Sequence, residues 1–152
     1  MNVMNLLLSA FAKQIGVSDL KFDATGVCQL RIDGLRVALY DNPELCCLTL
    51  LAELPMPTLD VFQRDAWIRF VLTRQFDTLH EQVPIVGLNP QTDSLVALRH
   101  LPSTNLSLER LTDAVAGLVD WLAAWSRESS SLPFESPVFA VRHDTLHSTH
   151  QL

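Results

Sequence analysis

The stretch from Leu59 to Gln82 constrains the fold of this chain more than any other. It contains no glycine or proline, and prolines stand on both sides of it, at Pro57 and Pro84. Asp60 followed by Gln63 matches a capping box, in which each side chain accepts a hydrogen bond from the other residue's backbone N–H. The stretch is therefore predicted to be one helix of about 24 residues, roughly 36 Å long at about 1.5 Å per residue.

The apolar residues of this predicted helix follow three lines along it. By helical spacing these are Ile68, Leu72, Phe76, Leu79 and Val83, then Phe62, Ala66 and Phe70, then Trp67 and Val71. A helix that covers only its own sheet needs one apolar face of roughly 100°. We therefore predict that one side covers the sheet and that the helix pairs with a second copy of the chain through Phe62, Ala66, Trp67, Phe70 and Val71. The alternative is a helix buried at the centre of a monomer, but the 152 residues leave little chain to wrap it.

A shorter apolar helix is predicted over residues 3 to 15, with Gly16 placed to cap its C-terminal end. Helical spacing places two apolar sets on it, namely Met4, Leu7, Leu8, Phe11 and Ile15 on one face and Val3, Leu6 and Ala10 on another. Two interpretations stay open. Both faces are buried within the protein, or one packs inward and the other offers an apolar surface to a partner.

Strands are predicted between and after these helices. Residues 27–33 and 35–41 alternate between apolar and polar side chains, and Asp33-Gly34 between them matches a two-residue hairpin turn that requires positive φ. Leu45–Leu54 is apolar on both sides, which is typical of a central strand. Residues 85–88 and 94–101 form a second pair, and a last helix runs from Ser107 to Arg127. The order α-β-β-β-α-β-β-α predicts an α+β fold, with helices packed against an antiparallel sheet.

We expect one domain over residues 1–128 and a flexible tail over residues 129–152, where small polar residues are frequent and no period is evident. His143, His147 and His150 in the tail have a spacing that a metal ion could use. A metal site needs ligands held by surrounding hydrogen bonds, which an unstructured tail does not supply. Solvated histidines and no bound metal are therefore expected.

Cys47 is the one candidate nucleophile, with His80 or His100 as its base. It lies in the most apolar predicted strand, where burial raises the pKa of a thiol and makes it unreactive. The chain also lacks a phosphate-binding loop, a dinucleotide fingerprint and a Gly-x-Ser-x-Gly motif. We expect no enzymatic activity and no cofactor.

Composition narrows the class of partner. The net charge is −6 and the 11 basic residues are scattered, so nucleic acid and anionic membranes are poor partners. The 48% hydrophobic content against 18% charged leaves apolar surface to be explained. No apolar run reaches the roughly 18 residues of a spanning helix, and no signal peptide is expected at the N-terminus. Three cysteines, two of them adjacent, favour a reducing cytoplasm over a disulfide framework.

The element order, the acidic pI and the short apolar first helix resemble the class I type III secretion chaperones of the Tir chaperone family. The stretch LRIDGLRVALYDNPELCCLTLLAELP carries most of this likeness, because it matches the family's strand–turn–strand–strand pattern before the dimer helix. The likeness covers roughly residues 1 to 127.

The resemblance implies a homodimer in the cytoplasm of a Gram-negative bacterium. It would bind the N-terminal chaperone-binding segment of a secreted effector and deliver it to the secretion apparatus, with the secretion ATPase as a further partner. The effector would contact the first helix and the strands that follow it, and the anchors that we expect are Leu6, Leu7, Ala10, Phe11, Val37 and Leu48. The alternative is a cytoplasmic adaptor or regulator of the same fold that binds a folded partner protein.

Overall fold

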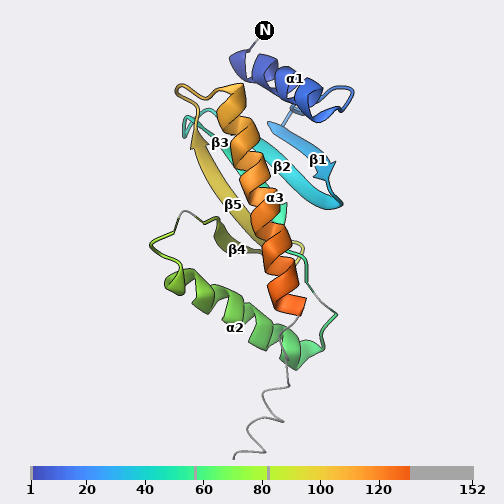
Figure 1. Ribbon diagram of the computed structural model, residues 1–152, viewed down its shortest axis with the longest axis vertical. Coiled ribbons are helices and arrows are strands. Elements are labelled where there is room, and N and C mark those ends of the chain that lie inside the picture. The colour runs from blue at the N-terminus through green and yellow to red at the C-terminus, as the bar shows by residue number, and fades with distance from the viewer. Residues whose placement is uncertain (1, 57, 82, 131–152) are drawn as a thin grey trace, which may run out of the picture. The chain divides into compact units, whose positions relative to one another are not determined.

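The computed structural model describes residues 2–56, 58–81 and 83–130. Its elements follow the predicted order (Figure 1): α1 (Val3–Ile15), β1 (Val27–Ile32), β2 (Leu35–Asn42), β3 (Cys47–Glu53), α2 (Val61–Asp77), β4 (Ile85–Asn89), β5 (Ser94–Pro102) and α3 (Leu108–Ser130). The five strands form one antiparallel sheet in the order β1-β2-β3-β5-β4. The predicted α+β fold is confirmed, and so is the central place of the third strand.

The chain divides into two compact units, which are described separately. Unit 1 contains Met1–Leu54 and Pro84–Ala124, and therefore the sheet, α1 and most of α3. Unit 2 contains Pro55–Val83 and Trp125–Leu152, and therefore α2 and the last turns of α3.

Strand register gives the sheet of unit 1 two different faces. Cys28, Leu39 and Leu50 stand opposite one another on β1, β2 and β3, and all three are buried. We call this side the covered face, because α3 crosses it in Figure 1 and buries its own apolar stripe, Leu111, Ala114, Val115, Leu118 and Leu122. The opposite side, the outer face, carries exposed side chains such as Gln29, Arg31 and Arg36.

Several predicted boundaries differ from the structure. The third strand begins at Cys47 because Leu45 and Cys46 belong to the turn before it, where Cys46 has a φ of 50°. The long helix spans Val61–Asp77 and so is shorter at both ends than the predicted Leu59–Gln82. At its C-terminal end, the hydroxyl of Thr78 donates to the carbonyl oxygen of Arg74 and caps the last turn. The last helix continues to Ser130, beyond the predicted Arg127.

Two local predictions are confirmed in detail. Asp33 and Gly34 have φ values of 51° and 80°, as the two-residue hairpin turn requires. At the start of α2, the Gln63 N–H donates to Asp60 Oδ1 at 2.8 Å, and the Asp60 N–H donates to Gln63 Oε1 at 3.1 Å. Both depend on neighbours in the sequence, which is why the sequence predicts them well.

Candidate partner-binding surfaces

Both ends of α1 are capped, which stabilises the helix. The Asn2 side chain accepts a hydrogen bond from the Met4 N–H at 2.8 Å, which satisfies a donor that the first turn would otherwise leave free. Gly16 ends the helix with a φ of 80°, a conformation that glycine adopts without steric cost. The helix has two apolar faces, and its packing against the rest of unit 1 determines which of them meets solvent.

The two apolar faces of α1 have different roles. Leu8, Phe11 and Ala12 are buried in unit 1, whereas Val3 is 77% exposed and Leu6 is 55% exposed. Leu7 and Ala10 lie between the two faces and are half-buried. Of the two interpretations that the sequence left open, the structure supports the one in which one face packs inward and the other meets solvent.

Three of the six predicted effector anchors lie in the core, and their predicted surface position is wrong. Phe11 has no exposed surface, because its face of α1 packs inward. Val37 and Leu48 are 2% and 1% exposed, because strand alternation places both on the covered face. Leu6, Leu7 and Ala10 keep surface that a partner can reach, and their role in binding stays a prediction.

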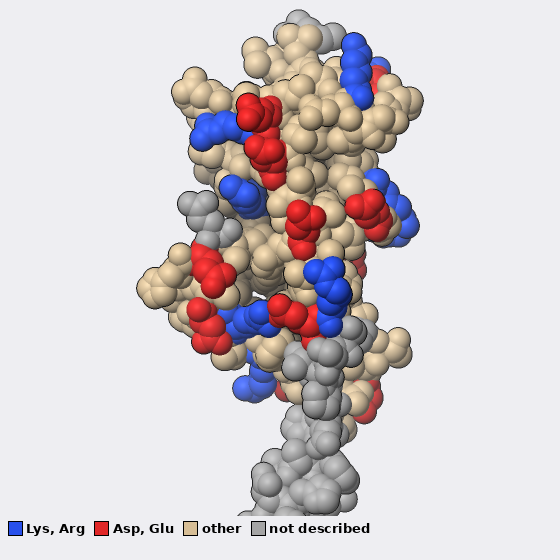
Figure 2. Space-filling view, in the orientation of Figure 1, with Lys and Arg blue, Asp and Glu red and all other residues tan. Residues whose placement is uncertain are grey.

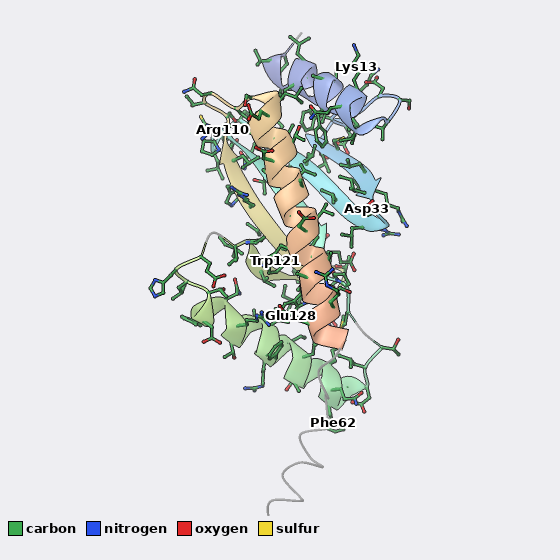
Figure 3. All side chains as sticks on the ribbon, viewed as in Figure 1. Lys13, Asp33, Phe62, Arg110, Trp121 and Glu128 are labelled. Carbon is green, nitrogen blue, oxygen red and sulfur yellow. The ribbon has the colours of Figure 1, made fainter. Side chains whose placement is uncertain are left out.

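In unit 2, one side of α2 packs against an aromatic ring of α3. Trp67 is fully buried and meets Trp125 edge to face, with ring centroids 6.3 Å apart. Phe70 stacks on the same indole at 5.7 Å, and the Arg74 guanidinium lies 5.3 Å from its centroid. Arg74 also forms an ion pair with Glu128, which is labelled on α3 in Figure 3. This side of α2 is occupied within a single copy of the chain.

The predicted dimer residues therefore divide into two sets. Trp67 and Val71 are buried within the chain, so they offer no surface to a second copy, and that part of the prediction is wrong. Phe62 is 53% exposed, and Ala66 and Phe70 are half-buried.

The side of α2 opposite Trp67 presents an apolar stripe, and Phe62 is the one member of it that the sequence analysis assigned to the dimer interface. The members of this stripe are exposed large side chains that recur at helical spacing, namely Val61, Phe62, Leu72 and Phe76. Leu72 and Phe76 belong to the first of the three lines read from the sequence. Spacing shows that residues share a line, but it does not show which line meets solvent. We call this set the α2 stripe.

On the outer face of the sheet, the structure brings together Cys47, Thr49 and His100. The Thr49 hydroxyl lies 2.8 Å from His100 Nδ1, and Cys47 Sγ lies 3.8 Å from the same nitrogen. The sequence analysis paired Cys47 with His100 as one of two candidate bases, and these two residues are indeed neighbours. The shorter contact is the one from Thr49, however, so the ring nitrogen is held by a hydroxyl.

Asp23 forms hydrogen bonds with both backbone groups of Val27, the first residue of the edge strand β1. Its carboxylate accepts hydrogen bonds from the Val27 N–H at 3.0 Å and the Thr25 hydroxyl at 2.6 Å, and its own N–H donates to the Val27 carbonyl at 2.9 Å. The Thr25 hydroxyl and the Val27 amide hold the pKa of this carboxyl below its usual value of 3.8. The N–H and the carbonyl of Val27 therefore both have a hydrogen-bond partner at the sheet edge. Asp23 does not supply such partners to the β1 residues that follow Val27.

Two features of residues 2–56, 58–81 and 83–130 concern metal ligands and membrane-spanning helices. These ranges contain no cluster of three histidine, cysteine or acidic residues suited to a metal ion. Within the same ranges, no helix has both the length and the apolar character needed to cross a bilayer. Figure 2 shows acidic and basic side chains interspersed within each unit. The candidate metal ligands His143, His147 and His150 lie outside the described residues, as does most of the predicted tail over residues 129–152.

Comparison with known proteins identifies the class. The profile of the Tir chaperone protein (CesT) family matches residues 6–126, which is most of the chain. Two solved structures share 25% sequence identity with it. One is a chain of the HopA1–SchA chaperone–effector complex, with a TM-score of 0.66 and coverage of 82% of this chain and 97% of that one. The other is a chain of the ExsC–ExsE complex, with a TM-score of 0.70 and coverage of 84% and 96%.

A third structure, the Yersinia pestis type III secretion chaperone SycH in complex with a stable fragment of YscM2, shares the fold. Its TM-score is 0.58 at 19% identity, over 79% of this chain and 97% of that one. A comparison with curated protein sequences finds no match. The chain thus has the fold of a secretion chaperone, and it belongs to the Tir chaperone protein (CesT) family. The predicted resemblance, and with it the type III secretion chaperone class, is confirmed.

Proposed function

We propose that this protein is a homodimeric cytoplasmic chaperone of a Gram-negative bacterium. It binds the N-terminal segment of a secreted effector, keeps that segment competent for secretion and delivers it to the secretion apparatus, including the secretion ATPase. The exposed apolar face of α1 is the observation that carries this proposal, since Val3 and Leu6 are 77% and 55% exposed on a helix whose other side is core. Such a surface fits a partner that supplies apolar anchors.

An unfolded partner makes a particular demand on this surface. Ordering an extended segment costs conformational entropy, so the complex needs many apolar contacts along a path. Each large side chain that becomes fully buried contributes roughly 1.5–3 kcal/mol. Leu6, Leu7 and Ala10 form the start of such a path, and Phe11 supports it from behind as part of the core.

The α2 stripe supports the proposed dimer. Phe62 and Phe76 are 53% and 75% exposed, with Leu72 and Val61 on the same side of the helix. A symmetric interface places the same patch of both copies face to face, which would bury each stripe against its counterpart. Phe62 and Ala66 remain proposed interface residues, and Leu72 and Phe76 are added to them.

No catalytic role is proposed. In the cluster of Cys47, Thr49 and His100, the thiol is 7% exposed and the ring nitrogen contacts a hydroxyl. The ring nitrogen nearest to the thiol is thus taken up by the closer Thr49 hydroxyl, at 2.8 Å against 3.8 Å for Cys47 Sγ.

The test is co-expression with a candidate effector, a secreted protein encoded beside this chain. The expected result is a complex of two chaperone chains with one effector, in which the first part of the effector is protected from a protease and the rest is cleaved. Protection of a whole folded domain, with no protected terminal segment, would contradict the proposal and favour the adaptor alternative.

A further inference from the structure

The outer face of the sheet carries a groove that the proposed function does not use. Its volume is about 860 Å³, and it lies over β1, β2, β3 and β5. The half-buried side chains of Ala38, Leu51 and Val96 make its floor apolar. All of these residues belong to unit 1.

Two arginines stand side by side at one end of the groove. Arg31 and Arg36 are direct partners in the β1–β2 register and flank the Asp33-Gly34 turn, where Figure 3 labels Asp33. Residues directly opposite on one face of an antiparallel pair have Cβ atoms roughly 4.5–5.5 Å apart, and like charges in that position destabilise the pair. Both guanidinium groups are exposed.

One acidic side chain stands beside this pair, since Glu53 on β3 follows Arg36 in the same cross-strand row, and the three residues together carry a net charge of +1. Ion pairs in the described part of the chain include Lys21 with Asp19, Arg69 with Asp65 and Arg74 with Glu128. Arg31 and Arg36 take part in none of them, although Glu53 lines the same groove. Because two guanidinium groups share a single neighbouring carboxylate, they keep hydrogen-bond donors with which to bind a second anion.

Charge complementarity therefore selects the occupant. The chain has a net charge of −6, so an acidic segment is repelled by most of the surface and attracted at this point. The apolar floor excludes water and suits the side chains that flank the acid in an extended peptide. We infer that this groove binds an acidic residue, flanked by apolar residues, in the extended segment of the effector. The inference rests on the proposed function and adds a charge preference to it.

Glu53 gives the groove a direction. It belongs to β3, so the positive end of the groove lies over β1 and β2 and its negative charge lies over the next strand. When the acidic residue of a bound peptide lies near the arginines, another part of the peptide lies near Glu53. A neutral or basic residue is favoured there, because an acidic one would be repelled by Glu53. The groove thus sets which end of the bound segment lies over which strand.

The test uses three synthetic peptides of nine residues that alternate valine and threonine and differ only at the central residue, which is Glu, Gln or Lys. Their binding to the full-length chain is followed by fluorescence anisotropy and by backbone amide shifts of β1 and β2. Because hydrogen bonds to charged groups are worth more than neutral ones, the Glu peptide is expected to bind at least about tenfold more tightly than the Gln peptide. Equal binding of the Glu and Gln peptides would overturn the inference.

Variants then assign the effect to the arginine pair. R31Q/R36Q is expected to abolish the Glu preference and leave the binding of the Gln peptide unchanged. K21Q/R110Q removes the same total charge from exposed positions of unit 1 and should keep the preference. E53Q should tighten binding of the Glu peptide. If K21Q/R110Q loses as much as R31Q/R36Q, the effect is one of general charge and the inference fails.

Effector capture is measured separately, so that the two proposals fail in different ways. If the chain captures an effector but shows no Glu preference, the inference fails and the proposed function stands. If the Glu preference is present but no secreted protein is captured, the chaperone function fails while the groove remains an acidic-peptide site.

Discussion

The indole rings of Trp67 on α2 and Trp125 on α3 meet edge to face, with their centroids 6.3 Å apart and their planes inclined by 62°. This geometry is a favoured arrangement of aromatic rings and is worth about 0.5–1.5 kcal/mol beyond the area that it buries. Phe70 and Arg74 contact the same Trp125 ring. These contacts of unit 2 therefore converge on Trp125, which lies 51 to 58 positions from its three α2 partners in the sequence.

Trp125→Ala is expected to destabilise α2 strongly. The substitution removes the ring that Trp67, Phe70 and Arg74 share, and large-to-small changes of this kind cost about 3–5 kcal/mol. Chemical denaturation should show the loss, and hydrogen exchange should locate it in α2. Trp125→Phe is the matched control, since it keeps a ring to stack on Phe70 and should recover much of the stability. Unchanged exchange in α2 would show that the cluster does not hold this helix.

Phe76→Asp is expected to convert the proposed dimer to a monomer without unfolding the chain. Phe76 is 75% exposed, so the charge costs little in the monomer and becomes unfavourable when two α2 stripes meet. Light scattering should give the mass of one 17.0 kDa chain for the variant and twice that for the parent protein. Ala116→Asp, at an exposed position of α3, is the control and should leave the dimer intact. A parent protein that is monomeric at micromolar concentration would rule out the proposed dimer.

Substitutions at Leu6 and Phe11 should distinguish an effect on effector binding from an effect on folding. Leu6→Asp changes an exposed side chain, so the variant should fold and dimerise but capture its effector at least about tenfold more weakly, given the value of one large buried side chain. Phe11→Asp places a carboxylate in the core and should prevent folding, as seen by circular dichroism. A folded Leu6→Asp variant with full capture would remove α1 from the binding surface.

The three cysteines should react at different rates. Cys46 is exposed in the turn before β3, whereas Cys28 and Cys47 are buried. Burial raises the pKa of the Cys28 thiol, so its reactive thiolate is scarce at neutral pH. A thiol reagent should modify one cysteine rapidly in the native protein and all three after unfolding. Cys46→Ser should abolish the rapid phase, and a rapid phase that persists would contradict the burial of the other two.

The turn before β1 should weaken at acid pH. The folded-state pKa of Asp23 lies below its usual 3.8, so its ionised form stabilises the fold above that pH, and this contribution is lost as the pH falls through the folded-state value. Asp23→Asn should therefore be less stable than the parent at neutral pH, with a difference that shrinks below pH 3.8. Thr25→Val removes the largest cause of the shift and should raise the Asp23 pKa in an NMR titration. A difference that is independent of pH would show that the charge has no part in the turn.

Interactions between sequence neighbours were predictable. The capping box of Asp60 and Gln63 and the turn at Asp33-Gly34 involve residues at most three positions apart, so local backbone chemistry decides them. Alternation in β1 and β2 likewise follows from the geometry of a strand, and the element order then limited the fold to an antiparallel sheet with helices. These features predicted the fold, and the resemblance of the element order and of the stretch LRIDGLRVALYDNPELCCLTLLAELP to a known family predicted the chaperone family.

The tertiary structure decided which apolar residues are surface and which are core. Leu6 and Phe11 are equally apolar members of one helix, and their spacing does not tell which faces solvent. Trp67 is as suited to a dimer interface as Phe62 until Trp125, far along the chain, is placed beside it. Helical period records the direction of a side chain relative to its own axis, whereas burial depends on segments that arrive from elsewhere in the chain. For that physical reason, the sequence located the two helices with more than one apolar face, but only the packed structure identified the residues on their exposed faces.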